Sequence, residues 1–99
     1  MSNALQDKIC VVTGATRGIG RGCAVALAEK GATVFVTGRS DGDGELTIQG
    51  TVAAIEAAGG KGFGFKVDHG VDSEIEAFFA KVAEQAGKID ILVNNAGYG

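Results

Sequence analysis

The sequence predicts an α/β fold in which helices pack on a parallel sheet of four strands, and two patterns support this prediction. Short apolar runs rich in β-branched residues alternate with longer segments whose apolar residues recur at helical spacing. Glycines stand at the boundaries between most of these segments. Strands that alternate with helices are joined by right-handed crossovers, which make the strands parallel and favour the order 3-2-1-4 in a doubly wound sheet.

The first strand and the first helix are predicted on either side of a glycine-rich turn. Residues 8–13 form a short, continuous apolar run, which is typical of a strand buried on both faces. From Gly18 the apolar residues recur at helical spacing as far as Lys30, and Gly31 follows where a left-handed cap would lie. Residues 33–37 are β-branched and aromatic, and they predict a second buried strand.

The second half of the chain repeats the alternation. A helix is expected from Ile48 to the glycines at 59–60, followed by strands at residues 62–67 and 90–93. Between these two strands lies the most regular helical pattern, with one apolar face. That face consists of Ile75, Phe78, Phe79 and Val82.

The start and end of this third helix carry their own signals. Ser73 and Glu76 have the spacing of a capping box, in which each side chain accepts a backbone N–H at the first turn. Gly87 stands where a helix typically ends in a left-handed residue. The sequence therefore predicts a helix that begins at Ser73 and ends before Gly87.

Composition limits the class of protein. The chain has 99 residues, 45% hydrophobic and 21% charged, with a net charge of −3. This length fits one domain, residues 1–99, and no apolar run is long enough to span a bilayer. No dense basic cluster indicates nucleic acid. Cys10 and Cys23 lack the spacing of a metal or redox motif, so we expect free thiols, a cytoplasmic location and no bound metal.

The glycine-rich turn after the first strand is suited to a pyrophosphate. A turn that leads into a helix presents backbone N–H groups that the helix itself leaves unsatisfied, and the helix dipole favours an anion there. Gly14 can adopt a conformation that other residues avoid, Gly18 lets a phosphate approach the backbone, and Gly20 lets the helix pack closely on the strand.

Two motifs resemble those of the short-chain dehydrogenase/reductase family. T-G-x-x-x-G-I-G follows the first predicted strand at residues 13–20, and N-N-A-G follows the fourth at residues 94–97. The resemblance implies a Rossmann-type, three-layer α/β/α fold, of which this chain would be the N-terminal, cofactor-binding half, truncated after the fourth strand. It also implies which residues of the two motifs contact a nicotinamide dinucleotide. They are Gly14, Ala15, Thr16, Arg17, Gly18, Ile19, Gly20, Asn95, Ala96 and Gly97.

The end of the second strand bears on the choice between NADP(H) and NAD(H). In similar proteins an acidic residue there accepts hydrogen bonds from the adenosine ribose and repels a 2′-phosphate, whereas an arginine favours the phosphate. Gly38 stands at the acidic position, and Arg39 beside it offers a guanidinium fork. The resemblance places Arg17 near the same phosphate and Asp68 near the adenine amino group. NADP(H) is the expected cofactor, with NAD(H) the alternative.

The residues that transfer a proton during hydride transfer in the resembling family are not found in this sequence. The family uses a serine and a Tyr-x-x-x-Lys pair, in which the tyrosine is the acid or base. The only tyrosine here, Tyr98, is followed by Gly99 alone, and His69, the only histidine, is assigned no catalytic role. We therefore assign no catalytic residue and expect the chain to be inactive by itself.

A second interpretation remains open at this stage. The chain would be a non-catalytic module that binds a dinucleotide or a partner subunit through the open sheet edge at residues 90–93. Both interpretations use the same phosphate loop. A homo-oligomer would favour the interpretation as a binding module. A missing C-terminal half would favour the interpretation as part of an oxidoreductase.

Overall fold

Strands and helices alternate throughout the structure, a computed structural model that describes residues 4–15, 18–39 and 47–95. The alternation confirms the type and order of every element that the sequence predicts. In chain order these elements are β1 (Ile9–Thr13), α1 (Gly18–Glu29), β2 (Thr33–Gly38), α2 (Ile48–Ala57), β3 (Lys61–Lys66), α3 (Asp72–Ala86) and β4 (Ile91–Asn94).

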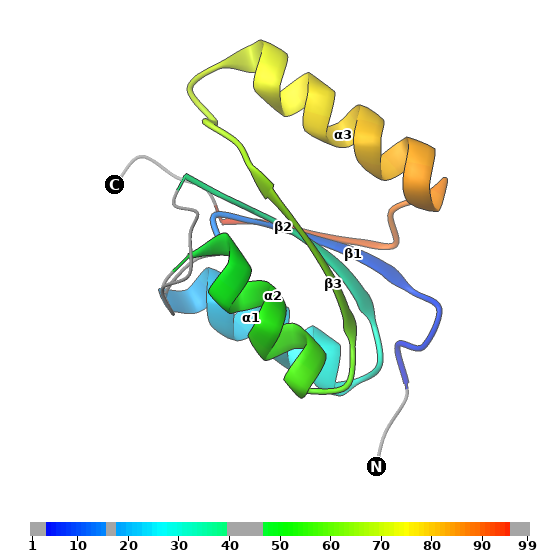
Figure 1. The fold of residues 1–99 in the computed structure, drawn as a ribbon. Coiled ribbons are helices and arrows are strands. Elements are labelled where there is room, and N and C mark those ends of the chain that lie inside the picture. The colour runs from blue at the N-terminus through cyan, green and yellow to red at the C-terminus, as the bar shows by residue number, and fades with distance from the viewer. Residues whose placement is uncertain (1–3, 16–17, 40–46, 96–99) are drawn as a thin grey trace.

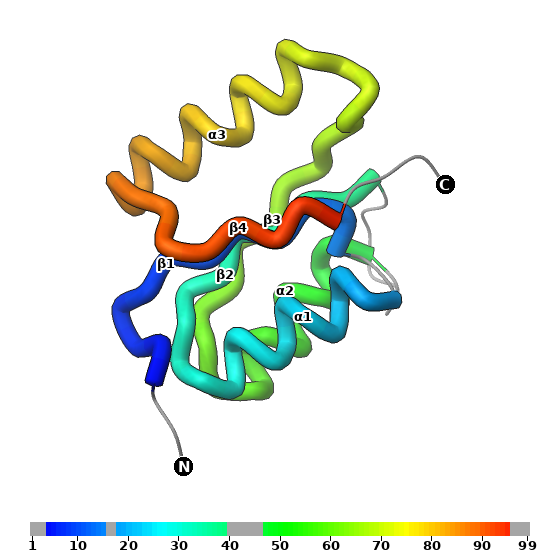
Figure 2. Tube along the Cα trace, turned by 180° about the vertical axis from the view of Figure 1, so that it is seen from behind, coloured from blue at the N-terminus to red at the C-terminus, as the bar shows by residue number. Residues whose placement is uncertain are grey.

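The four strands form one parallel sheet in the order β3-β2-β1-β4, as the crossover rule predicts. In the middle of the sheet Val11 of β1 lies in register with Phe35 of β2 on one side and Leu92 of β4 on the other. Helices α1 and α2 cover one face, and α3 covers the other (Figure 1). The view from behind shows the same three layers (Figure 2).

Each face of the sheet has its own hydrophobic core, because side chains alternate along a strand. The core under α1 and α2 contains Cys10, Val12, Val34, Val36 and Ile55. The core under α3 contains Val11, Phe35, Val67, Phe78 and Val82. The central strands β1 and β2 are buried on both faces, as their uninterrupted apolar sequences predict.

Glycine and phenylalanine alternate along the edge strand β3, so its two faces pack against different layers. A Cβ at Gly64 would overlap the Cγ2 of Ile48, so the bare backbone lets α2 lie close to the strand. On the opposite face Phe63 stacks on Phe35 with ring centroids 5.0 Å apart, and Phe65 meets Phe78 edge-on at 5.4 Å. The strand therefore contributes to both cores although most of its residues are exposed.

The start of α3 differs from the sequence prediction. The helix begins at Asp72 with Val71 as its N-cap, and no side chain caps it, so the predicted capping box of Ser73 and Glu76 is wrong. The first helical hydrogen bonds, from the N–H groups of Glu74 and Ile75, go to the Val71 carbonyl, so the helix starts before Ser73 is reached. Gly87, with φ of 77°, ends the helix as predicted.

All four strands differ by one residue from the sequence prediction. The first starts one residue later than residue 8, and the second ends one residue later than residue 37. The third strand starts and ends one residue earlier than residues 62–67, and the fourth starts and ends one residue later than 90–93. Within the described residues, no helix combines the length and hydrophobicity needed to cross a membrane.

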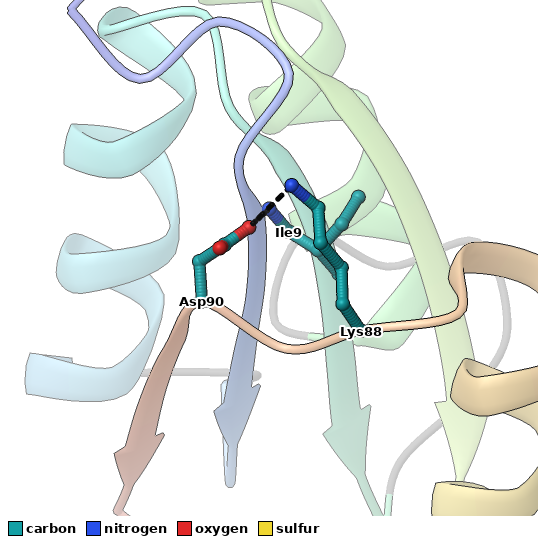
Figure 3. Close-up of polar contacts among 3 residues, drawn as sticks. All are labelled: Ile9, Lys88 and Asp90. Atoms are coloured by element: carbon teal, nitrogen blue, oxygen red, sulfur yellow. Dashed lines mark hydrogen bonds and ion pairs between the residues drawn. The ribbon is translucent and has the colours of Figure 1, made fainter.

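Asp90 fastens the start of β4 to the start of β1, at the amino edge of the sheet. Its carboxylate Oδ2 accepts the Ile9 N–H at 2.8 Å and lies 3.3 Å from Lys88 Nζ (Figure 3). Its own N–H donates to the Ile9 carbonyl at 2.8 Å. The hydrogen bond from Ile9 lowers the pKa of Asp90, and Lys88 and Lys8 add to this effect against a smaller opposing contribution from desolvation.

We expect Asp90→Asn to reduce the loss of stability in acid. A carboxyl group whose pKa is lowered by folding stabilises the fold fully above its unfolded pKa, and this stabilisation is lost as pH falls through the folded pKa. The variant lacks this titration. Urea unfolding midpoints measured from about pH 3 to 7, a range that spans the usual aspartate pKa, should therefore vary less in the variant than in the wild type. Equal pH dependence in both proteins would contradict this role.

Candidate functional site

The loop after β1 lies where the carboxyl ends of β2 and β4 flank it, because β1 sits between these two strands. Its first residue, Gly14, has a left-handed φ of 65°. The Gly14 N–H donates to Thr37 Oγ1 at 3.1 Å, and the Gly14 carbonyl accepts from Asn95 Nδ2 at 3.0 Å. The next N–H, of Ala15, donates to the Thr37 carbonyl at 2.8 Å. The loop is thus held from both neighbouring strands.

Gly20 brings the start of α1 against this loop. A Cβ at position 20 would overlap the Gly14 carbonyl oxygen and lie 2.6 Å from Asn95 Nδ2. Real side chains do not tolerate such contacts with backbone, so only glycine fits here without displacement. Residues 14, 20 and 95, which the sequence places in two separate motifs, therefore meet at one point.

The first turn of α1 leaves its N–H groups available to a ligand. An α-helix does not satisfy its first N–H groups internally, and no acidic side chain lies in this turn. At Gly18, where φ is 63°, no atom of the described residues beyond the chain neighbours lies within 4 Å of where a Cβ would be, and Ile19 is 78% exposed. The helix start is open, positively polarised backbone, which suits an anion.

The segment after β4 is tied to β1 by a threonine. The buried Thr13 Oγ1 accepts the N–H of Asn95 at 3.0 Å and donates to Asn94 Oδ1 at 3.1 Å. These bonds fix the first two residues of the N-N-A-G motif and aim the Asn95 amide at Gly14.

Thr51, on the buried side of α2, is a residue that the sequence analysis missed. Its Oγ1 donates to the Ala15 carbonyl at 2.8 Å, and the side chain is fully buried. A threonine on an otherwise apolar helix face, among Ile48, Val52 and Ile55, was the signal available in the sequence. Thr51 fixes the glycine loop from α2, whereas Thr37 and Asn95 fix it from the strands.

We expect Thr51→Val to destabilise the fold and loosen the glycine loop. Valine matches threonine in shape but leaves the Ala15 carbonyl without its donor, which costs about 1–3 kcal/mol when the group is buried. Thermal unfolding should show a lower midpoint for the valine variant. Thr51→Ser, which keeps the hydroxyl but lacks the methyl group, is the matched control, and an unchanged midpoint in Thr51→Val would contradict the role of the hydroxyl.

The residues expected to contact the adenosine end lie around the same edge. Arg39 is exposed directly after Gly38, the last residue of β2. Asp68 follows β3, and its Oδ1 accepts the Gly70 N–H at 2.9 Å. The remaining predicted contacts lie outside the described residues. They are Thr16, Arg17, Ala96 and Gly97.

Neither cysteine belongs to this site. Cys10 is buried in the sheet and Cys23 is half-buried on α1, and both are free thiols. Burial, and secondarily the charge of Asp90, raises the pKa of the Cys10 thiol, so it stays protonated and unreactive at neutral pH. Among residues 4–15, 18–39 and 47–95, no group of three histidine, cysteine or acidic side chains could hold a metal ion.

A parallel sheet in the order 3-2-1-4 with a glycine turn at its carboxyl edge defines a Rossmann-type nucleotide-binding fold. A family model described as short chain dehydrogenase matches residues 8–99. The chain therefore belongs to the short-chain dehydrogenase family.

Two relatives match nearly the whole length of this chain. It is 47% identical over 91 residues to a 3beta-hydroxysteroid dehydrogenase of Mediterraneibacter gnavus, covering 92% of this chain and 32% of that protein. It is 42% identical over 96 residues to dehydrogenase/reductase SDR family member 1 of Mus musculus, covering 96% of this chain and 29% of the relative. The chain thus spans about a third of the length of these relatives.

Solved structures agree with the fold. A putative dehydrogenase from Xanthomonas campestris superposes with a TM-score of 0.87 at 37% identity, covering 98% of this chain and 36% of that one. An NADH-dependent reductase complexed with NAD superposes with a TM-score of 0.84 at 32% identity, covering 99% of this chain and 39% of that one.

Proposed function

We propose that this chain is the NADP(H)-binding portion of a short-chain dehydrogenase/reductase-like oxidoreductase, with residues 1–99 as its cofactor-binding domain. The observation that carries the proposal is the contact of Gly20 with Gly14, which leaves room for backbone but not for a side chain. When bound, the dinucleotide would supply the hydride donor or acceptor for a carbonyl or alcohol substrate. No residue of this chain is proposed as catalytic.

The pyrophosphate would bind at the start of α1. The N–H groups of Gly18 to Gly20 are not used within the helix, and the close approach of α1 to the loop directs them at the carboxyl edge of the sheet. Thr37, Thr51 and Asn95 hold the loop in place before a ligand arrives. Such preorganisation reduces the entropy lost on binding.

NADP(H) is proposed over NAD(H) from the end of β2. Gly38 offers no carboxylate for the ribose hydroxyls, and the exposed Arg39 next to it can form a charge-assisted bond with a 2′-phosphate. The relative complexed with NAD supports a nicotinamide dinucleotide as the ligand class. The preference for NADP(H) rests on Gly38 and Arg39, with Arg17 as the second cation that the family resemblance places near the phosphate.

Amide chemical shifts recorded during titration with NADPH test the proposed site. We expect the largest changes in the Gly18–Gly20 turn, whose N–H groups would bind the pyrophosphate, and further changes at Gly14, Ala15 and Asn95, which lie beside it. Asp90, at the opposite edge of the sheet, provides the internal reference and should not move. Changes spread evenly over the chain, or absent at the glycine loop, would refute this placement.

A cytoplasmic location is proposed on a narrower basis. Both cysteines are free, and a reducing compartment keeps thiols in that state.

A partner-binding module remains the second candidate because of the surface beside β4. This strand is one edge of the sheet, and its Leu92 is 51% exposed while the preceding Ile89 is 40% exposed. An apolar edge strand favours pairing with another chain. Sedimentation equilibrium of the wild type and of Leu92→Lys distinguishes the cases, because only a module that pairs through this edge should form a dimer that the lysine disrupts.

A further inference from the structure

The conformation of Gly14 is determined by hydrogen bonds on both of its flanking peptide planes. The dihedral angles φ and ψ describe how these two planes are rotated about the Cα. The peptide plane before Gly14 is held by a hydrogen bond from the Gly14 N–H to Thr37 Oγ1, 3.1 Å away. The peptide plane after Gly14 is held by two hydrogen bonds. Asn95 Nδ2 donates to the Gly14 carbonyl, and the Ala15 N–H donates to the Thr37 carbonyl. Together they fix the left-handed φ from which the glycine loop starts.

The Thr37 hydroxyl can rotate about its Cβ–Oγ1 bond, and His69 lies beside it. His69 Nε2 is 2.9 Å from Thr37 Oγ1, and Thr37 is fully buried. A hydroxyl has one proton to donate and two lone pairs that accept, and Gly14 occupies one lone pair. Within the described part of the chain, His69 Nε2 is the neighbour that can take the Thr37 proton.

Donation from Thr37 to His69 determines the state of the imidazole. A buried hydroxyl proton without an acceptor is unfavourable, which favours donation from Thr37 Oγ1 to His69 Nε2 over the reverse direction. Nε2 must then be unprotonated, and the proton of the neutral ring is on Nδ1. A hydroxyl that donates also becomes a better acceptor, which strengthens its bond with the Gly14 N–H.

We propose that His69 is a positioning residue of the dinucleotide site, which orients the Thr37 hydroxyl so that it holds Gly14 in its left-handed conformation. The effect on ligand binding rests on the proposed function, whereas the hydrogen-bond chain from His69 to Gly14 does not. His69 touches neither the reacting atoms nor, in this proposal, the ligand.

The loop that carries His69 is anchored by hydrogen bonds, so the backbone that positions the imidazole is held in place. The Asp68 N–H donates to Glu74 Oε1 on α3 at 2.9 Å, and the Gly70 N–H donates to Asp68 Oδ1 at 2.9 Å. The chain of contacts therefore runs from α3 through the β3–α3 loop to the glycine loop. It connects Asp68, the predicted adenine contact, with the loop proposed to hold the pyrophosphate of the same ligand.

Nuclear magnetic resonance of the wild-type chain tests the hydrogen-bond chain without any ligand. Long-range ¹⁵N correlation spectra at mildly alkaline pH should show His69 as the Nδ1–H tautomer. The Nε2–H tautomer would overturn the proposal, because Thr37 would then accept from His69. Gly14 amide exchange should be about three- to tenfold faster in His69→Leu, the range expected when one neutral hydrogen bond is weakened.

Binding of NADPH to three His69 variants separates positioning from packing. Glutamine places an acceptor near the position of Nε2, asparagine is too short to do so, and leucine fills space without an acceptor. We expect His69→Gln to bind within about twofold of the wild type, and His69→Asn and His69→Leu to bind about three- to tenfold more weakly. Equal loss in all three variants would overturn the proposed role.

The nuclear magnetic resonance data and the NADPH titrations distinguish failure of the proposed function from failure of the His69 proposal. If the wild type binds neither NADPH nor NADH, the proposed function fails, and the tautomer and the Gly14 exchange rate still decide the role of His69. If the wild type binds but His69→Leu changes neither Gly14 exchange nor affinity, the positioning role is wrong and the proposed function stands. The double variant with Thr37→Val and His69→Leu should bind NADPH no more weakly than Thr37→Val alone. The two substitutions interrupt the same chain of hydrogen bonds, which runs from His69 through Thr37 to Gly14.

Discussion

Gly20→Ala should abolish measurable NADPH binding and destabilise the fold by about 1–3 kcal/mol, the usual cost of overpacking. The added methyl group would overlap the Gly14 carbonyl oxygen and press on Asn95 Nδ2. Neither neighbour can move freely, since Gly14 belongs to the backbone and Asn95 is tied to Thr13. The start of α1 must therefore shift away from the loop, and the N–H groups proposed to bind the pyrophosphate shift with it.

Gly22→Ala is the matched control in the same helix. Nothing lies within 4 Å of a Cβ at position 22, and the residue has a helical rather than left-handed conformation. Alanine should raise stability here by about 0.5–1 kcal/mol through its helix propensity and leave NADPH binding unchanged. Urea unfolding and NADPH titration of the two variants decide the matter, and wild-type affinity in Gly20→Ala would show that the close approach is not needed for binding.

Arg39→Asp should reverse the order of affinities for NADPH and NADH. Arginine in this position would form charge-assisted bonds with a 2′-phosphate, each contributing about 1.5–3 kcal/mol, or about 10- to 150-fold in affinity. The aspartate would repel that phosphate and accept hydrogen bonds from the ribose hydroxyls of NADH. Dissociation constants for both ligands, measured at one ionic strength, give the result.

Lys81→Asp controls for the change in net charge. Lys81 is exposed on the second half of α3, which runs back toward the amino edge of the sheet. This substitution changes the net charge by the same amount on another element, so it should weaken both ligands only slightly and leave the order of their affinities unchanged. An unchanged order of affinities in Arg39→Asp would remove Arg39 from the phosphate site.

The sequence was sufficient to predict the strand order and the type of every element because periodicity and crossover handedness are local or topological rules. β1 and β2 show this clearly: their uninterrupted apolar runs predicted central, buried strands, and both are central and buried. The start of α3 was predicted wrongly, because the first helical hydrogen bonds go to the Val71 carbonyl and the helix begins before the capping residues that the local pattern favoured.

The glycines of the site could be predicted from the sequence, but the side chains that hold them could not. Thr37 contacts Gly14 across 23 positions, and Thr51 contacts Ala15 across 36. Threonine is common in strands, so Thr37 carries no local signal. Thr51 on the apolar face of α2 indicates a buried hydroxyl but not the residue that it contacts. His69 was assigned no role for the same reason, since its contact with Thr37 arises only when the ends of β2 and β3 come together.

Calorimetric titration of the 99-residue chain with NADPH, and in parallel with NADH, is the most direct test of the proposed cofactor site. Saturable binding that is tighter for NADPH is the predicted result, and it would establish that the glycine loop and Arg39 form a working site. Tighter binding of NADH would contradict the assignment of Arg39, and binding of neither ligand would contradict the proposed function.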